Sequence, residues 1–325
     1  MVASAPSTLE HNELVNETPR LDAAAAFELR SAELVRSAER AAGENDASAL
    51  LELRIAARRL RAAVELFKPS LPKRLHRRAR KALKRLSRIG ARAGDVQHVL
   101  LAEAHTASAD LAEKAAIEYV LEQVDGARSA SRPSLLQKLD DIGPGHVAAV
   151  LERLAEKAAA DDRPKRRARR AFKMLDGLID DAFASLPDRT ALESPDALER
   201  AHTSVRALRY ALEAIVPSLG GVAELVRPIG ELEQALGTLL DRSELLSMLD
   251  EQRAELVRHS RNVLADQIAR LVERTRGQNR ALGDRAVTLA QQLDRERLTA
   301  ELRSTLGVKP KGRNGHEHPD GDDSN

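Results

Sequence analysis

Two segments of the chain carry rows of arginine with the spacing of a helix face, and such rows could bind an anion. On a helix with about 100° per residue, Arg54, Arg58, Arg61 and Glu65 lie within a sector of about 60°. The second row has the same spacing and consists of His202, Arg206, Arg209 and Glu213. Because a guanidinium presents a planar fork of donors, arginine rows suit the oxygens of phosphate groups.

Both rows lie beside the apolar stripe of their helix and not opposite it. In the first helix the stripe includes Leu53, Leu60 and Val64 and is centred about 100° from the row. A row in this position can point into a groove between neighbouring helices. We include the adjacent Arg59 and Tyr210 in the predicted polyanion-binding site.

A glutamate ends each row. Glu65 follows Arg61 by four positions, and Glu213 follows Arg209 by the same interval. Residues four apart on a helix are neighbours, so opposite charges at this spacing form ion pairs. We therefore expect each glutamate to orient the arginine before it.

A denser basic segment follows the first row. From Arg54 to Arg92 the chain has fifteen Lys or Arg and one acid. Helical spacing aligns four of these cations, namely Arg77, Lys81, Lys84 and Arg88. A fifth cation, Arg85, is expected to lie nearer the core. Like charges four residues apart repel, so this row indicates a polyanion or an acidic neighbouring helix. The row lies opposite the apolar stripe, and an ordinary exposed charged face is the alternative interpretation.

A third basic cluster opens a later helix. Seven Lys or Arg and no acid stand between Arg163 and Lys173, and the cluster's candidate site residues are Arg166, Arg169, Arg170 and Lys173. Cations at a helix N-terminus oppose the macrodipole, which is unfavourable unless they serve a ligand. A basic linker that continues into a helix is the alternative.

The composition favours helix throughout. The chain has 325 residues, of which 42% are hydrophobic and only 2% aromatic, and it lacks both Trp and Cys. Aromatic and β-branched residues favour strands, whereas the Ala, Leu, Glu and Arg that dominate here favour helix. Without Cys there is no disulfide or thiolate site, and we see neither a signal peptide nor an apolar run long enough for a membrane span. We therefore expect a cytoplasmic protein.

Periodic stretches separated by Gly and Pro predict the order of helices. The expected helices are 22–42, 47–67, 72–92, 95–125, 132–140, 144–160, 163–185, 194–216, 221–238, 241–276 and 278–304. We divide the chain into a flexible arm (1–20), two helical halves (21–160 and 161–305) and a disordered tail (306–325).

An internal repeat relates the two halves. Residues 53–72 align with residues 201–220, with eight of twenty positions identical, including the Pro-Ser-Leu that ends each helix. Each half is long enough for a four-helix bundle. The repeat therefore predicts an all-α fold of two related helical halves in tandem, and the arginine rows predict a basic groove between helices.

At these residues the chain resembles the CHAD family, the conserved-histidine α-helical domain. The similar stretches are LRIAARRLRAAVELFKPSLP (53–72), the following LKRL and GD (83–95), VRALRYALEAIVP (205–217) and ALGTLLD (235–241). The resemblance spans most of residues 45–300. It implies two four-helix bundles around a basic channel, binding of inorganic polyphosphate, and association with polyphosphate granules.

The chain departs from the family pattern at its signature positions. The two family histidines would fall at Leu51 and Glu199, and His202 replaces an arginine of the second copy. The family's L-G-x-x-R-D motif is degenerate in both halves, where it ends in Asp95 and Asp241. The sequence is thus similar to CHAD domains as a divergent member.

The predicted function is binding of a polyanion, with no catalysis, no cofactor and no metal. The histidines are scattered singly, and the chain has no Gly-rich phosphate loop of the Walker type. Inorganic polyphosphate is the favoured ligand. A helical scaffold that docks an acidic protein or a granule surface is one alternative. Nucleic acid is another, although the aromatic side chains on which bases would stack are scarce.

Overall fold

The computed structural model describes residues 21–43, 47–89, 94–108, 110–160 and 163–309. Within these ranges every regular element is a helix and none is a strand, which confirms the predicted all-α class. The first half contains α1 (Ala23–Gly43), α2 (Ala47–Leu66), α3 (Lys73–Leu86), α4 (Asp95–Ala107), α5 (Leu111–Ile142) and α6 (Pro144–Ala159). The second half contains α7 (Pro164–Ala184), α8 (Pro195–Glu213), α9 (Ala223–Arg258), α10 (Asn262–Gln292) and α11 (Arg295–Thr305). Three short 3-10 turns stand at Lys68–Ser70, Ala191–Glu193 and Gly220–Val222.

Four helices of the first half form a bundle around an aliphatic core. α1 packs against α2 and α6, and α3 also packs against α2 and α6. Each helix contributes a buried leucine to the centre, namely Leu34, Leu53, Leu83 and Leu151. The bundle forms because each helix turns the apolar stripe of its sequence toward the others.

The second half repeats this order of helices. At the offset of 148 residues, α1, α2, α5 and α6 overlap α7, α8, α10 and α11, while α3 and α4 both overlap the single long helix α9. α8 packs against α7 and α9, and α11 packs against α7. The buried Phe172, Leu208, Leu232 and Leu302 join the same core cluster as the first bundle, so one core runs through both halves.

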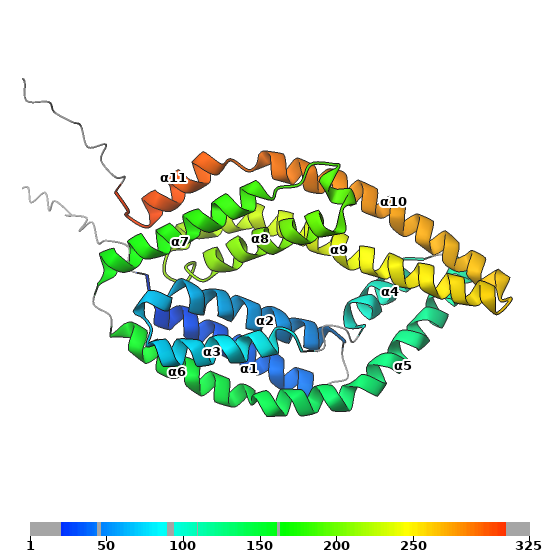
Figure 1. The fold of residues 1–325 in the computed structure, drawn as a ribbon, viewed down its shortest axis with the longest axis horizontal. Coiled ribbons are helices and arrows are strands. Elements are labelled where there is room, and N and C mark those ends of the chain that lie inside the picture. The colour runs from blue at the N-terminus through cyan, green and yellow to red at the C-terminus, as the bar shows by residue number, and fades with distance from the viewer. Residues whose placement is uncertain (1–20, 44–46, 90–93, 109, 161–162, 310–325) are drawn as a thin grey trace, which may run out of the picture.

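The two bundles meet along α2 and α8, the helices that carry the two arginine rows. In Figure 1 these helices lie next to each other through the middle of the molecule. α2 also packs against α4, and α4 packs against α9. Two helices from each half therefore surround the same central space.

A second, smaller core lies at the end of the molecule away from residues 21 and 309. There α4 and α5 pack against parts of α9 and α10, at the right-hand end of Figure 1. Its buried side chains include Leu101, Ile117, Leu249 and Ile268. The sequence analysis did not predict this packing unit, to which each half contributes two helices.

Helix boundaries differ from those predicted at several points of the chain. The expected helix 95–125 is interrupted before α5, whose N-terminus is capped by the carboxylate of Asp110. The expected break before residue 132 is absent, because α5 continues through Pro133. α9 replaces parts of two expected helices and ends near Ser260, which adopts a positive φ of 57°.

The predicted arm at residues 1–20 and most of the predicted tail lie outside the described residues. Leu306, the first residue of that predicted tail, is fully buried in the core. Among the described helices none is both long and apolar enough to cross a lipid bilayer.

Candidate functional site

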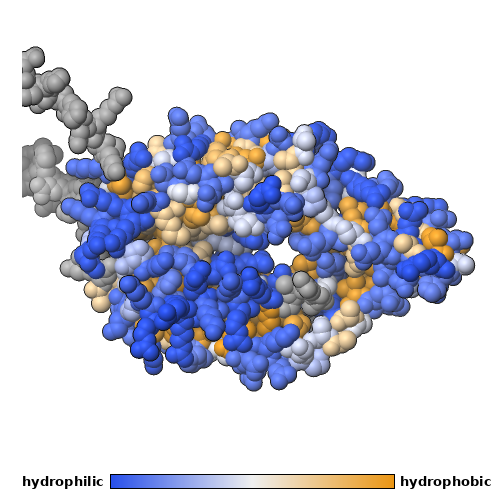
Figure 2. Space-filling view, in the orientation of Figure 1, coloured by the Kyte–Doolittle hydropathy of each residue, from blue (hydrophilic) through white to orange (hydrophobic). Residues whose placement is uncertain are grey.

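A pocket of about 860 Å³ lies between α2, α4, α8 and α9. Figure 2 shows the surface hollowed near the centre of the molecule, where the two halves meet. Five arginines of the predicted site line this pocket, namely Arg54, Arg58, Arg59, Arg206 and Arg209. His202 and Tyr210 line it as well. The structure thus brings residues from both rows together, because the rows flank the apolar stripes by which α2 and α8 pack.

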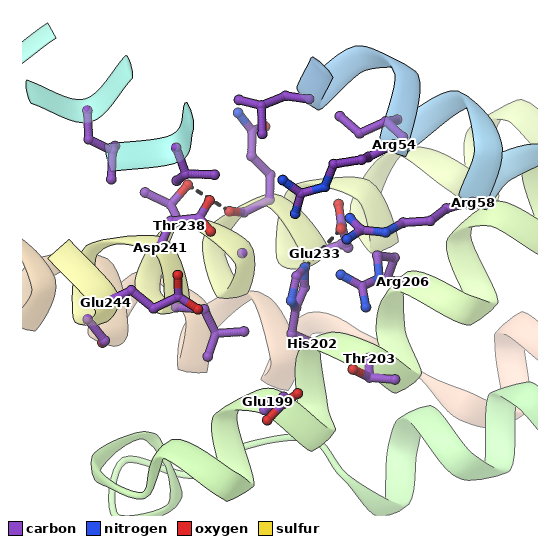
Figure 3. A pocket seen from close by; sticks show the side chains of 18 of the residues that line it. Arg54, Arg58, Glu199, His202, Thr203, Arg206, Glu233, Thr238, Asp241 and Glu244 are labelled. Carbon is purple, nitrogen blue, oxygen red and sulfur yellow. Dashed lines mark hydrogen bonds and ion pairs between the residues drawn. The ribbon is translucent and has the colours of Figure 1, made fainter. Parts of the chain in front are cut away.

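Three of these arginines have no carboxylate partner in the described part of the chain. Arg54, Arg58 and Arg206 form no hydrogen bond or ion pair with a described residue, and the Arg54 Nε is buried without a partner. Figure 3 shows their guanidinium groups extending into the pocket from α2 and α8. Burial, followed by repulsion from Arg206 and Arg54, lowers the pKa of Arg58 to about 10. Arg58 is still charged at neutral pH, so the cluster presents a desolvated positive charge to the pocket.

The other two arginines and the histidine are neutralised by buried glutamates. Arg209 donates to Glu213 at 2.8 Å and to Glu233 at 2.6 Å, and the His202 Nε2 lies 3.0 Å from Glu233. The Arg59 Nε lies 2.9 Å from Glu213. Burial alone would raise the pKa of Glu233, but His202 and Arg209 outweigh it and lower that pKa. These charges hold α2, α8 and α9 together.

Tyr210 stands between two of these arginines. The guanidinium carbons of Arg59 and Arg209 lie 5.8 Å and 6.0 Å from the ring centroid, within the range of cation–π attraction. Burial, followed by the negative charge of Glu233, raises the pKa of Tyr210. The positive charges of Arg206, Arg58 and Arg59 oppose this increase. Its hydroxyl is therefore protonated at neutral pH and can donate a hydrogen bond to a ligand in the pocket.

A glycine on α9 permits the close approach of His202. A Cβ at Gly237 would lie 3.1 Å from the His202 Nε2, closer than ordinary contact. At Gly230, about two turns earlier, a Cβ would lie 3.5 Å from the Arg209 Nε. Glycine inside a helix lowers helix stability, so a glycine at this position marks a packing requirement. Gly237 belongs to the second copy of the degenerate L-G-x-x-R-D motif, which was its only signal in the sequence.

Carboxylates line the other end of the pocket, and the sequence analysis did not place them there. They are Asp95, Asp196, Glu199, Asp241 and Glu244, from α4, α8 and α9. Asp95 is held by Arg128 at 3.1 Å. Burial and then Glu244 raise the pKa of Asp241 above its ordinary value. In the described residues these acids and the histidines form no group of three or more that could hold a metal ion.

A family model described as the CHAD domain matches residues 25–250, which is more than half of the chain. The chain belongs to the CHAD family. The CHAD domain from the plant Ricinus communis is similar in structure, with a TM-score of 0.54, 19% identity, and coverage of 88% of this chain and 93% of that chain. PptA from Streptomyces chartreusis is also similar in structure, with a TM-score of 0.54, 20% identity, and coverage of 85% of this chain and 100% of that chain. These similarities show the shared fold. No curated protein matches the chain.

The CHAD signature positions fall in the pocket even though their residues differ. Leu51 and Glu199 stand where the family pattern has histidine, and both line the pocket. Asp95 and Asp241, which end the two degenerate motifs, line it as well. The departures from the family pattern therefore lie in the lining of this pocket. At the two histidine positions, a neutral side chain and an acidic side chain replace residues that can carry a positive charge.

The basic row of α3 lies outside the pocket, although the sequence analysis placed it in the same site as the α2 and α8 rows. Its members Arg77, Lys81, Lys84, Arg85 and Arg88 are all exposed, including Arg85, which was expected nearer the core. α3 buries Ala79, Leu83 and Leu86 against its neighbours, so its cations face outward. Figure 2 shows a mainly hydrophilic surface over this part of the CHAD fold.

The basic cluster of α7 is also separate from the pocket. Arg166, Arg169, Arg170 and Lys173 are exposed and do not line it. Arg167, which was not in the predicted site, donates to the backbone carbonyls of Leu21 and Ala158 and so ties α7 to the first bundle. We therefore exclude the α7 cluster from the site.

One of the two expected ion pairs within the rows is present. Arg209 pairs with Glu213 as predicted. In the first row, no ion pair joins Arg61 to Glu65 among the described residues, because Glu65 instead contacts Arg80 of α3 at 2.7 Å. Arg61 lies beside the pocket and does not line it.

Proposed function

We propose that this CHAD protein binds inorganic polyphosphate, without a catalytic step, in the pocket between α2 and α8. The observation that carries the proposal is the set of three converging guanidiniums, Arg54, Arg58 and Arg206, that lack a carboxylate partner in the described chain. A cluster of like charges in a partly buried site is unfavourable by itself. A bound anion removes that cost, so the binding site is prepared for negative charge.

The shape and chemistry of the pocket favour a narrow phosphate chain. Its volume of about 860 Å³ suits a small or linear ligand and excludes a nucleic acid duplex. Arginine forks can each contact two phosphate oxygens, and Tyr210 adds a neutral donor. Tyr210 is the one aromatic residue among those that line the pocket, and its ring is flanked by Arg59 and Arg209. Bases of a single-stranded nucleic acid would therefore find no open stacking platform.

The arrangement of titratable groups supports binding and not catalysis. His202, the histidine of the pocket, has its Nε2 3.0 Å from Glu233 and so takes part in the packing of α8 against α9. The resemblance to CHAD domains points to the same ligand and to the surface of polyphosphate granules as the place of binding. We propose that location for this protein in cells that form such granules.

The proposal is tested by titrating the protein with polyphosphate and with duplex DNA at equal phosphate concentration. We expect tighter binding of polyphosphate, with affinity falling steeply as salt rises. The double variant Arg58→Ala/Arg206→Ala should lose about tenfold or more in polyphosphate affinity. The matched control, Arg166→Ala/Arg169→Ala on α7, removes the same charge from an exposed face and should change the affinity little. Equal loss in both variants, or tighter binding of DNA, would contradict the proposal.

A further inference from the structure

The acidic end of the pocket is a second charged feature, and the proposed phosphate ligand does not use it. Asp95, Asp241 and Glu244 line the pocket there, and we call these three residues the acidic subsite. Asp95 begins α4, whereas the other two residues lie three positions apart on α9. Figure 3 shows Asp241 and Glu244 on the side of the pocket away from Arg58 and Arg206. The pocket therefore has a positive end and a negative end.

Asp95 carries a carboxylate oxygen that is ready to accept a hydrogen bond. Only 2% of its side chain is exposed, and its Oδ1 accepts from the Arg128 Nε at 3.1 Å. Its Oδ2 is buried and has no hydrogen-bond partner in the described part of the chain. A buried charged oxygen without a donor costs free energy. A ligand in the pocket that donates to this oxygen would remove the cost.

The two acids of α9 lack a bonded cation. Neither Asp241 nor Glu244 forms an ion pair with a described residue, and Glu244 accepts only a hydrogen bond of 3.4 Å from Gln97. Burial, followed by Glu244, raises the pKa of Asp241. Burial likewise lowers the pKa of Arg54, and the three acids of the subsite oppose that effect without bonding to it. These carboxylates therefore attract a cation from solution.

Apolar side chains beside the carboxylates indicate the kind of cation. Val96, Val99 and Leu240 line the same pocket and are partly exposed. Val99 lies one helical turn after Asp95, and Leu240 directly precedes Asp241. An alkyl chain can cover such apolar surface while ammonium groups along it donate to separate carboxylates. A linear polyamine has this structure, with positive charges separated by methylene groups.

We propose that the acidic subsite binds a linear polyamine, so that the pocket holds an organic cation beside the phosphate groups at its arginines. The cation site itself is argued from the residues of the acidic subsite, and its pairing with phosphate rests on the proposed function. Opposite charges on the two ligands attract each other, so each ligand should raise the affinity for the other by the same factor. The inference gives a role to acids that weaken the binding of phosphate alone.

The experiment titrates the protein with spermidine, a linear polyamine, at constant ionic strength. Asp241→Asn/Glu244→Gln removes two charges of the acidic subsite with little change in side-chain volume. The matched control, Glu255→Gln/Asp266→Asn, removes the same two charges from exposed positions that do not line the pocket. Circular dichroism checks that both variants fold.

Each titration is run without and with inorganic triphosphate. A protein-free titration corrects for the binding of spermidine to triphosphate in solution. Magnesium ion replaces spermidine in a parallel series at the same ionic strength, so that an inorganic cation is compared with the organic one.

We expect the natural protein to bind spermidine without triphosphate, and the subsite variant to lose about tenfold or more in that affinity. The control variant should resemble the natural protein. With triphosphate bound, the affinity of the natural protein for spermidine should rise about fivefold, and that of the subsite variant should not rise.

Equal losses in the two variants, or no spermidine binding by the natural protein, would overturn the inference. A spermidine affinity that bound triphosphate leaves unchanged would do the same, as would magnesium binding that is as tight and as sensitive to Asp241→Asn/Glu244→Gln. Failure of the proposed function is recognised separately, because spermidine would then bind to the acidic subsite while triphosphate would not bind to the natural protein.

Discussion

At the scale of single residues, the pocket contains two kinds of arginine that differ in their partners. Arg209 is bonded to Glu213 and Glu233, so its charge stabilises the packing of α8 against α9. Arg58 forms no ion pair with a described residue, and repulsion from Arg206 and Arg54 adds to the cost of its burial. The same residue type therefore stabilises the fold at one position and destabilises it at the other. Residues kept at a cost to stability are typical of binding sites.

This contrast predicts opposite effects of one substitution on stability. Arg58→Met removes an unpaired, partly buried charge and should raise the free energy of unfolding by about 1–2 kcal/mol while weakening polyphosphate binding. Arg209→Met removes one of the partners of each of two buried glutamates and should lower the free energy of unfolding by about 2–3 kcal/mol. Urea unfolding of both variants measures the two values. A loss of stability in Arg58→Met comparable to that of Arg209→Met would show that Arg58 is structural.

Asp241 predicts how binding depends on pH. Burial and Glu244 raise the pKa of this carboxyl above its ordinary value, so Asp241 takes up a proton at a higher pH in the folded protein than in the unfolded chain. The stability that this group contributes is present at low pH and is lost as the pH rises through the raised pKa. As the pH falls from neutral, Asp241 takes up a proton, the pocket loses a negative charge, and polyphosphate should bind about threefold more tightly.

Asp241→Asn serves as the control for this pH effect. The amide should bind polyphosphate at neutral pH as tightly as the natural protein does in mildly acidic solution, and its affinity should vary less with pH. Titrations at several pH values and constant salt check this. An equally steep pH dependence in the variant would assign the effect to another group.

At the scale of elements, helical periodicity predicted the bounds of helices that are clearly amphipathic. It did not predict a helix end that depends on the capping side chain of a single residue. α2 and α8 match their predicted ranges closely, because each is an apolar stripe that stops at a Pro-Ser-Leu. The break before α5 depends on the cap provided by Asp110, whereas Asp125 lies inside the same helix. Local pattern does not distinguish these cases.

Pro133 is the clearest example of an element that contradicts its local signal. It lies inside α5 on an exposed surface, where it removes one backbone hydrogen bond from the helix. The helix continues because residues on both sides of it are packed, with Val124 in the small core and Leu139 in the large one. Tertiary contacts thus outweigh the propensity of a single residue.

We therefore predict that Pro133→Ala stabilises the protein. Restoring the helical hydrogen bond and a better helix former should raise the free energy of unfolding by about 1–3 kcal/mol. Chemical denaturation gives the value directly. Ligand affinity should be unchanged, since Pro133 is not among the residues that line the pocket. A decrease in stability would mean that the proline favours a bend that α5 needs.

At the scale of the whole molecule, the repeat relates the two halves without making the pocket symmetric. Arg58 and Arg206 are equivalent positions of the two copies, and both are unpaired cations of the pocket. Arg54 corresponds to His202, which is bound to Glu233 instead. The first copy therefore supplies more of the free positive charge.

The sequence predicted which helices carry the arginine rows and that these rows form one basic site, and it did not predict the six acids that line the same pocket. The rows were visible because they follow from the period of a single helix. The positions of Asp241 and Glu244 near Arg54 depend on how α9 packs against α8 and α4, which no local pattern records. The same limit applies to the small core, where α5 meets α10 across more than 100 residues of chain.

The most direct test of the central claim is a crystal structure of the protein with inorganic triphosphate. The account predicts phosphate groups between α2 and α8, with their oxygens within hydrogen-bonding distance, about 2.7–3.2 Å, of the guanidiniums of Arg54, Arg58 and Arg206. It also predicts that the end of the pocket near Asp241 holds no phosphate. Triphosphate bound only at α3 or α7, with the arginine cluster empty, would contradict the account.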